Sequence, residues 1–539
     1  MSTIFSFFKK VILRPNFIFV VLFALLAVLY YDSVLDKPPM SHHMWRQTDC
    51  LSLTKNYAEG ASFWEPEMHI QLGDHNTSGK SAGEFPILYY GIGQLWKFFG
   101  ESYLSYRLIY FVILFFGVFT FYKTLLLLLK NNFWAISLAL LLFTSPVYVY
   151  YGVSFLTDAP AFSFVLIALY FFTQYSIQGK QKLLYFSMGF FALGGLIKVS
   201  SLIAFLFLFG ILILETLPLQ LLYGHKLFKH RKREWIAFGL VLAVIFAWYY
   251  YASYYNSIHK FKYTFNNIYP LWIMGSDEVG TLLGDVKHFT SRIFFSRPVL
   301  LLLAIIGVFN LFLVNRIPIV AYLANIIIVI ASACYFVLWA PLLGIHDYYY
   351  VALLVLFPGI LIPFFLYVKG VSSRIYNSKV TYIIFSGFLA FNIIYCLSII
   401  QLKVNARNKE YAIVGNKKLV DEMKWFHWNS ISNEHRFIRM KSYINELGIT
   451  KEKKVIVFPD GSFNTSLYLM DRKGWTNILN YTTSEEIDVL ISKGAEYLFL
   501  AEPTFLEAPF LQPFLQEQVG NFEGITIFRL KPRRPINQN

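Results

Sequence analysis

The chain has 539 residues, of which 56% are hydrophobic and only 15% are charged. Soluble globular domains carry roughly 25% charged residues, so this composition indicates a polytopic membrane protein and argues against an ordinary soluble enzyme. The formal net charge of +15 is typical of basic cytoplasmic loops beside anionic lipid and gives no reason to expect a nucleic-acid partner. The three cysteines are far apart and lack metal-ligand spacing, so neither a zinc site nor a disulfide framework is predicted.

Membrane helices are predicted wherever the chain is apolar for long enough to cross the bilayer, which takes roughly 20 residues for a hydrocarbon core of about 30 Å. The first apolar run follows basic residues and has no cleavage site, so it is expected to be an uncleaved helix. The apolar block 183–222 has to be divided into two spans. The predicted spans, about eleven, are 17–32, 107–129, 133–151, 159–177, 183–197, 200–222, 235–254, 299–315, 317–340, 350–368 and 380–400.

The charges of the connecting loops predict the orientation. The N-terminus and the loop Lys226–Arg233 are basic, whereas the long loop 32–106 is rich in acidic residues. The positive-inside rule therefore places the N-terminus in the cytoplasm and the loop 32–106 outside. An odd number of spans also places the C-terminal region outside.

The loop 32–106 is too long and too aromatic for a plain connector. It contains the cluster Trp45-Arg46-Gln47-Thr48-Asp49, two expected amphipathic helices at 52–64 and 88–100, and a polar Gly/Ser segment at 73–86 that we expect to be mobile. Lys80 and Glu84 are the ionisable residues of interest in that segment. Each charge by itself is typical of a solvated loop, but two polar clusters beside interfacial helices favour a site.

Three later groups of polar residues are predicted on the same side. Asp158 precedes Pro160 and is equally suited to capping a helix. Lys198 follows a glycine pair and could simply extend its ammonium to the interface. His346, Asp347 and Tyr348 begin a late span, where the tyrosines alone would form an aromatic belt.

From about residue 401 the charge rises and the apolar runs shorten. Strands are predicted at 453–458, 497–500 and 525–530, and helices at 466–470 and 485–492, which together indicate a small α/β domain. No glycine-rich nucleotide-binding motif is present. We therefore predict two domains, a transmembrane domain at 1–400 and a soluble domain at 401–539.

The motif Trp45–Asp49 after the first span, followed by Gly83-Glu84-Phe85-Pro86 before an aromatic helix, resembles the bacterial relatives of the protein O-mannosyltransferases. These are GT-C membrane glycosyltransferases that use polyprenyl-phosphate sugars, and they include the aminoarabinose transferase that acts on lipid A. The sequences around Asp158, Lys198 and His346 are similar to motifs of the same family.

The resemblance implies transfer of a hexosyl or pentosyl group, with inversion, from an undecaprenyl-phosphate-type donor to a lipid, glycan or protein acceptor. It also implies a location in the bacterial inner membrane, with the C-terminal region in the periplasm or outside the cell. The implied catalytic residues are Asp49, as general base, and Asp158. The implied donor-phosphate contacts are Arg46, Lys80 and Lys198, and the implied sugar- or acceptor-orienting residues are Glu84, His346, Asp347 and Tyr348. No cofactor is expected, because a lipid phosphate is already a workable leaving group, although histidine with carboxylates could bind a divalent metal. A flippase or transporter of lipid-linked sugars, and a polysaccharide polymerase or ligase, stay open as alternatives.

Overall fold

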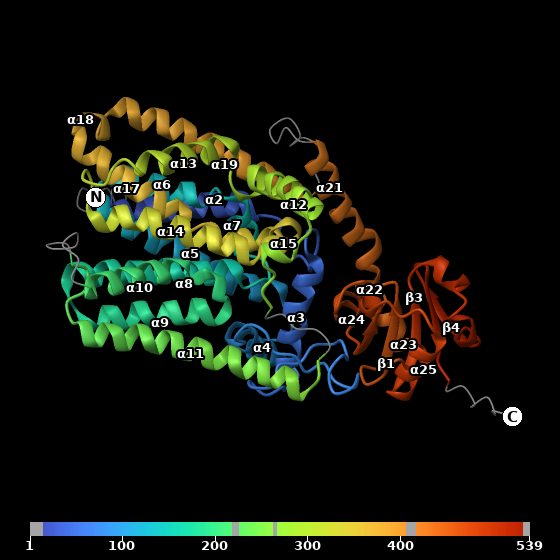
Figure 1. Cartoon of the computed structure of the whole chain (residues 1–539). Helices are drawn as coiled ribbons and strands as arrows, with labels where there is room; N and C mark the ends of the chain where they lie inside the picture. The colour runs from blue at the N-terminus through green and yellow to red at the C-terminus, as the bar shows by residue number, and fades with distance from the viewer. Residues whose placement is uncertain (1–13, 218–225, 262–266, 406–416, 532–539) are drawn as a thin grey trace, which may run out of the picture. The chain divides into compact units, whose positions relative to one another are not determined.

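The computed structural model describes residues 14–217, 226–261, 267–405 and 417–531. It divides into two compact units (Figure 1). The helical unit comprises Met1–Asp36, Tyr106–Trp248 and Ile268–Val420, and the sheet unit comprises Lys37–Ser105, Tyr249–Asn267 and Asp421–Asn539. The sequence predicts a single boundary after residue 400. The observed division differs because most of the loop 32–106 belongs to the same unit as the C-terminal region.

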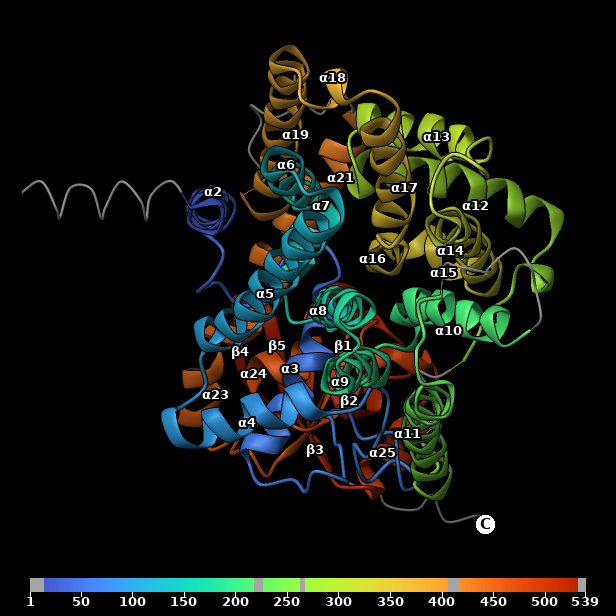
Figure 2. The same ribbon diagram turned by 90° about the vertical axis from the view of Figure 1, so that its left-hand side faces the viewer.

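The helical unit is built from long apolar helices. Its pairs α8 and α9, α10 and α14, and α14 and α17 pack side by side (Figures 1 and 2). Its elements are α2 Pro15–Tyr31, α5 Tyr103–Leu129, α6 Asn132–Leu142, α7 Pro146–Gly152, α8 Asp158–Gln178, α9 Gln181–Ile197, η1 Val199–Leu202, α10 Ile203–Thr216, α11 Arg231–Ile258, α12 Ser276–Phe289, α13 Arg297–Asn310, α14 Ile319–Leu338, α15 Ala340–Ile345, η5 Asp347–Tyr349, α16 Tyr350–Leu353, α17 Leu356–Val371, α18 Ser373–Tyr376 and α19 Lys379–Asn405. The last part of α11, from Tyr249, belongs to the sheet unit.

Seven helices in the described part of the chain are long and apolar enough to cross a membrane, or up to nine if each of two bent pairs is one span. The bent pairs are α6 with α7, bent by 73°, and the helical segment Ser276–Phe294 with α13, bent by 104°. Pro146 and Pro298 lie in the first turn after each break, where a missing N–H is tolerated. With the shorter apolar helices α2 and α9, these elements overlap every predicted span, which confirms the multi-pass helical fold class. Residues 218–222 of the predicted span 200–222 lie outside the described residues.

The core of the helical unit depends on close helix approach. All seven residues of α7 are buried, as are most of the first ten residues of α8. A Cβ added at Gly117 of α5 would lie only 2.7 Å from the Cβ of Ser163 in α8, so this contact requires small residues, as is usual between membrane helices. In contrast, Leu240 and Phe246 of α11 are 60% and 72% exposed, as expected for side chains that face lipid.

The sheet unit contains a five-stranded mixed sheet with the order β2-β1-β3-β5-β4. β1 pairs in parallel with β2 and β3, whereas β5 is antiparallel to β3 and β4. The strands are β1 Lys454–Phe458, β2 Gly474–Thr476, β3 Ala495–Leu500, β4 Gln518–Phe522 and β5 Ile525–Arg529, and the helices include α3 Met44–Ala58, α4 Ile87–Phe99, α21 Lys417–Asn429, α22 Arg436–Arg439, α23 Lys441–Glu446, α24 Thr465–Met470 and α25 Ser484–Ser492. The predicted C-terminal sheet domain is thus confirmed, with β2 and β4 added to the expected strands.

The segment 69–71 from the N-terminal half of the chain extends this sheet at β2. The backbone N–H of Gln71 donates to the carbonyl of Gly474 at 2.8 Å, and the N–H of Gly474 donates to the carbonyl of His69 at 3.2 Å. A Cβ at Gly474 would lie 1.9 Å from the carbonyl oxygen of Val455, so only glycine permits this packing. The pairing explains why the first loop and the C-terminal region form one unit.

Candidate functional site

The helix α3 carries the first predicted cluster. It begins at Met44, eight residues before the predicted amphipathic helix at 52–64, so the motif Trp45–Asp49 is helical rather than part of a loop. Arg46 and Asp49 are three residues apart and therefore share a helix face. The prediction missed this start because the residues buried along α3 are largely polar, the reverse of an ordinary amphipathic pattern.

Asp49 is a fully buried carboxylate. Its Oδ1 accepts a hydrogen bond of 2.7 Å from Nδ2 of Asn464, and its Oδ2 lies 3.6 Å from Nη1 of Arg46. Burial raises the pKa of Asp49 to about 6, although Arg46 and the Asn464 hydrogen bond act in the opposite direction. A carboxylate that changes protonation near neutral pH is suited to general-base catalysis.

Arg46 also contacts Glu84, which comes from the segment 73–86. Nη2 of Arg46 lies 2.5 Å from Oε1 of Glu84, so one guanidinium compensates two carboxylates. Arg46 is buried together with Asp49, and an unpaired charge there would be costly. The structure thus brings together three of the predicted site residues, Arg46, Asp49 and Glu84.

Lys80 lies elsewhere in the same segment. Its Nζ is 3.8 Å from Oε1 of Glu65, and its backbone forms an antiparallel bridge with Glu67. The expectation that this glycine-containing segment is mobile is wrong at Gly79, where a Cβ would lie 1.9 Å from the carbonyl oxygen of Met68. Gly79 permits close packing of two backbone strands. The carboxamide of Asn256 also holds Ala82 through two hydrogen bonds of 2.8 Å to its backbone.

A second cluster lies in the helical unit, where α8 and α9 form an antiparallel hairpin that brings the start of α8 to the end of α9. Oδ1 of Asp158 lies 3.1 Å from Nζ of Lys198, and this ammonium is 5.5 Å from the ring centroid of Tyr348. Asp158 is the first residue of α8, and Thr157 takes the N-cap position expected for Asp158. The carboxylate of Asp158 lies in the first turn of α8, where the helix dipole favours a negative charge. Asp158, Lys198 and Tyr348 therefore meet.

Asp347, in the same unit, is held by groups that the sequence reasoning missed. Its Oδ2 lies 2.6 Å from Nζ of Lys403, with both side chains fully buried, and the hydroxyl of Tyr151 donates to its Oδ1. Lys403 also lies 4.4 Å from the ring centroid of Tyr150. The only signal in the sequence was a lone lysine just beyond the predicted end of the last span.

His346 precedes this buried pair. Its ring stacks against Tyr348, with centroids 5.3 Å apart and an interplanar angle of 11°. The stacking links His346 to the residues around Lys198 rather than leaving it as an isolated interfacial side chain.

Comparisons with known proteins identify the fold. No protein-family model and no curated protein matches the sequence. ArnT from Cupriavidus metallidurans, solved in the apo state and bound to undecaprenyl phosphate, is 12% identical, has a TM-score of 0.56, and aligns over 95% of this chain and 97% of its own. The oligosaccharyltransferase of Archaeoglobus fulgidus in the apo form is 11% identical, with a TM-score of 0.51, over 90% of this chain and 69% of its own. At these identities the likeness concerns the fold, and it confirms the expected GT-C architecture.

Proposed function

We propose that this membrane protein of the GT-C fold is a glycosyltransferase that moves a sugar from a polyprenyl-phosphate donor to an acceptor outside the cytoplasm, with inversion at the anomeric carbon. The shared fold supports the proposal, because one of the similar structures is solved bound to undecaprenyl phosphate and another is an oligosaccharyltransferase. The donor would be of the undecaprenyl-phosphate type, the transferred group a hexose or pentose, and the acceptor a lipid, glycan or protein.

The observation that carries the proposal is the state of Asp49. One carboxylate oxygen is fixed by Asn464. The other, Oδ2, accepts no hydrogen bond from the described part of the chain, and the cation beside it is Nη1 of Arg46 at 3.6 Å. In the proposed step Oδ2 takes the proton from the acceptor hydroxyl while the acceptor oxygen bonds to the anomeric carbon. The bond from that carbon to the phosphate oxygen breaks, and the electron pair leaves with the polyprenyl phosphate. General-base catalysis of this kind contributes roughly 10²–10⁴-fold.

The cationic residues are proposed to bind the donor phosphate. A cation near the leaving oxygen stabilises the charge that develops there, and Lys198 is suited to this because Asp158 and two tyrosine rings hold its ammonium in place. Arg46 and Lys80 are the other candidates, and an arginine fork matches phosphate oxygens well. Asp158 is proposed to act in catalysis by orienting Lys198, whose ammonium lies 3.1 Å from its carboxylate.

Glu84, His346, Asp347 and Tyr348 are proposed to orient the sugar and the acceptor. The buried pair of Asp347 and Lys403 would do this indirectly, by fixing the backbone at the start of η5. We expect no metal or other cofactor, because protonation of Asp49 and departure of a phosphate need none.

The test is sugar transfer in proteoliposomes with radiolabelled polyprenyl-phosphate hexoses and pentoses as donors and membrane extracts as acceptors. We expect Asp49→Asn to reduce transfer by roughly 10²-fold or more, whereas Asp277→Asn, at an exposed position of α12, serves as the matched control and keeps the wild-type rate. A folded Asp49→Asn protein with normal transfer would disprove the base assignment. Wild-type protein that moves lipid between leaflets without transferring sugar would support the flippase alternative, and transfer only from diphosphate-linked glycans would support a polymerase or ligase.

A further inference from the structure

Asn464 connects the C-terminal region to the candidate base. It is fully buried and directly precedes α24. Its Nδ2 donates to Oδ1 of Asp49 at 2.7 Å, while its own Oδ1 accepts from the backbone N–H of Ile70 at 3.0 Å and from Oγ of Ser52 at 3.4 Å. Because the carboxamide oxygen faces two donors, the amide nitrogen must face the carboxylate.

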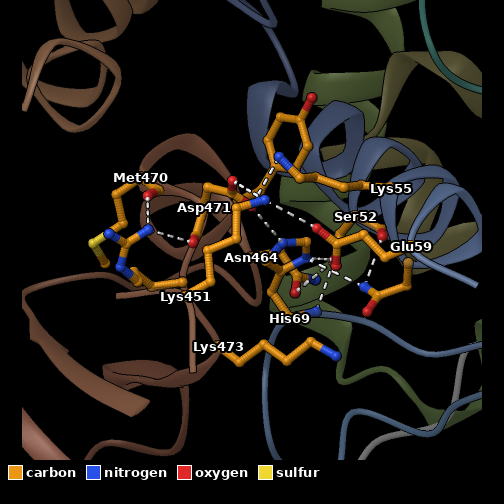
Figure 3. Close-up of polar contacts among 12 residues, drawn as sticks. Ser52, Lys55, Glu59, His69, Lys451, Asn464, Met470, Asp471 and Lys473 are labelled. Carbon is orange, nitrogen blue, oxygen red and sulfur yellow. Dashed lines mark hydrogen bonds and ion pairs between the residues drawn. The ribbon is translucent and has the colours of Figure 1, made fainter. Parts of the chain in front are cut away.

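The face of α3 that carries Asp49 is polar and buried, and it needs partners. Buried polar groups without hydrogen bonds are destabilising. The hydroxyl of Thr48 lies 3.1 Å from that of Thr465. One turn beyond Asp49, the Ser52 hydroxyl lies 2.7 Å from Nδ1 of His69 (Figure 3). The partners along this face come from α24 and from the segment that extends the sheet.

The far end of α24 is attached to the same face of α3 through Asp471. Asp471 has φ of 60°, and its carboxylate lies 2.8 Å from Nζ of Lys55 and 2.7 Å from Nζ of Lys451 (Figure 3). These cations, with His69, hold the pKa of Asp471 well below its usual range. Lys55 is bound in addition by Glu101 at 2.9 Å. Because α24 contacts α3 at both of its ends, a movement of Asn464 away from Asp49 would disturb the ion pair between Asp471 and the buried Lys55.

We propose that Asn464 is a positioning residue for Asp49: it fixes the rotation of the carboxylate so that Oδ2 is directed to the acceptor hydroxyl. The inference rests on the proposed function. It assigns the C-terminal region a role in the reaction, because Asn464, directly before α24, orients the carboxylate of Asp49.

Asn464 also acts on the charge of Asp49. Its donated hydrogen bond stabilises the carboxylate form and lowers the pKa of Asp49 from the value that burial alone would give. The other groups that face Asp49 are Arg46 and Cys50 on α3 and Glu84 from the segment 73–86; Arg46 lowers this pKa and Glu84 raises it. Burial raises the pKa of Cys50 to about 12, so this thiol is neutral throughout the relevant pH range.

The experiment measures the pH dependence of sugar transfer by the full-length protein in liposomes for Asn464→Leu and Asn464→Asp. Leucine removes the donor at similar volume, and aspartate keeps the shape but adds a like charge. We expect the acidic limb of the rate profile to move to higher pH, by about one to two units for leucine and at least as far for aspartate, because a hydrogen bond to a charged group has that magnitude. The KM for the donor should change little. Asn521→Leu, at an exposed position of β4, is the matched control.

Each outcome decides between separate claims. A lower kcat with an unmoved acidic limb in both variants would mean that Asn464 is only structural, and it would overturn the inference. If Asn464→Leu does not fold, as judged by thermal melting, the Asn464→Asp profile alone decides. Full activity of Asp49→Asn would instead overturn the proposed function, whatever the Asn464 variants do.

Discussion

At the scale of single residues, the environment of Asp49 determines what the candidate site can do. An exposed aspartate has a pKa near 3.9 and would be a weak base. Burial raises the pKa of Asp49 to about 6, while Arg46 and Asn464 prevent a larger rise. The carboxylate is therefore still charged at neutral pH but is a stronger base than an exposed one.

This pKa predicts the pH dependence of sugar transfer. Because the base acts in its deprotonated form, the rate should be constant above the pKa of Asp49 and fall about tenfold per pH unit below about 6. The measurement is kcat/KM from about pH 5 to about pH 8, with melting curves at each pH to show that the protein stays folded. A flat profile from a folded protein would be incompatible with Asp49 as the base.

At the scale of elements, two buried contacts fix the chain around the candidate residues: Asn464 with Asp49 in the sheet unit, and Lys403 with Asp347 in the helical unit. In the helical unit, Asp347 and Lys403 join η5 to the last turn of α19, and their side chains have no solvent exposure. A buried ion pair adds little stability compared with an apolar pair, but removal of one partner leaves an uncompensated charge, at a cost of about 3–5 kcal/mol.

We therefore predict that Lys403→Met lowers the melting temperature of the detergent-solubilised protein strongly, and that adding Asp347→Asn restores most of the loss. The second substitution removes the charge that the first one leaves unpaired. The matched control is Lys379→Met, an exposed lysine at the opposite end of the same helix, which should change the melting temperature little. Equal melting temperatures for Lys403→Met and wild type would show that the pair is not buried as described.

The same contacts explain which parts of the site were predictable. Arg46, Asp49 and Glu84 were predicted because local motifs contain them, and they do meet. Asn464 and Asp49 are 415 residues apart, and Lys403 and Asp347 are 56 residues apart. Neither Asn464 nor Lys403 belongs to a local pattern, so only the folded chain could identify them as partners.

At the scale of the whole molecule, the predicted helices of the membrane region were correct because the bilayer imposes a strong rule. Every span must be a long apolar helix whose backbone is internally hydrogen-bonded. Long apolar runs can be recognised directly in a sequence. The sheet unit obeys no comparable rule. Its strand β2 has three residues, too few to show a period, and β4 contains Gly520 and is partly exposed, so both were missed.

The orientation in the membrane follows from the same reasoning and can be tested on intact cells. Basic loops such as the one at Lys180 should face the cytoplasm, and the C-terminal region at Ser492 should face outside.

Both positions are exposed, so Lys180→Cys and Ser492→Cys can each be probed with a membrane-impermeant thiol reagent. The suitable background is Cys334→Ser, because Cys50 and Cys396 are buried whereas Cys334 is exposed on α14. We expect Ser492→Cys to be labelled in intact cells and Lys180→Cys only after permeabilisation. The reverse pattern would place the sheet unit in the cytoplasm. A polyprenyl-phosphate sugar on the outer face of the membrane could then not reach Asp49.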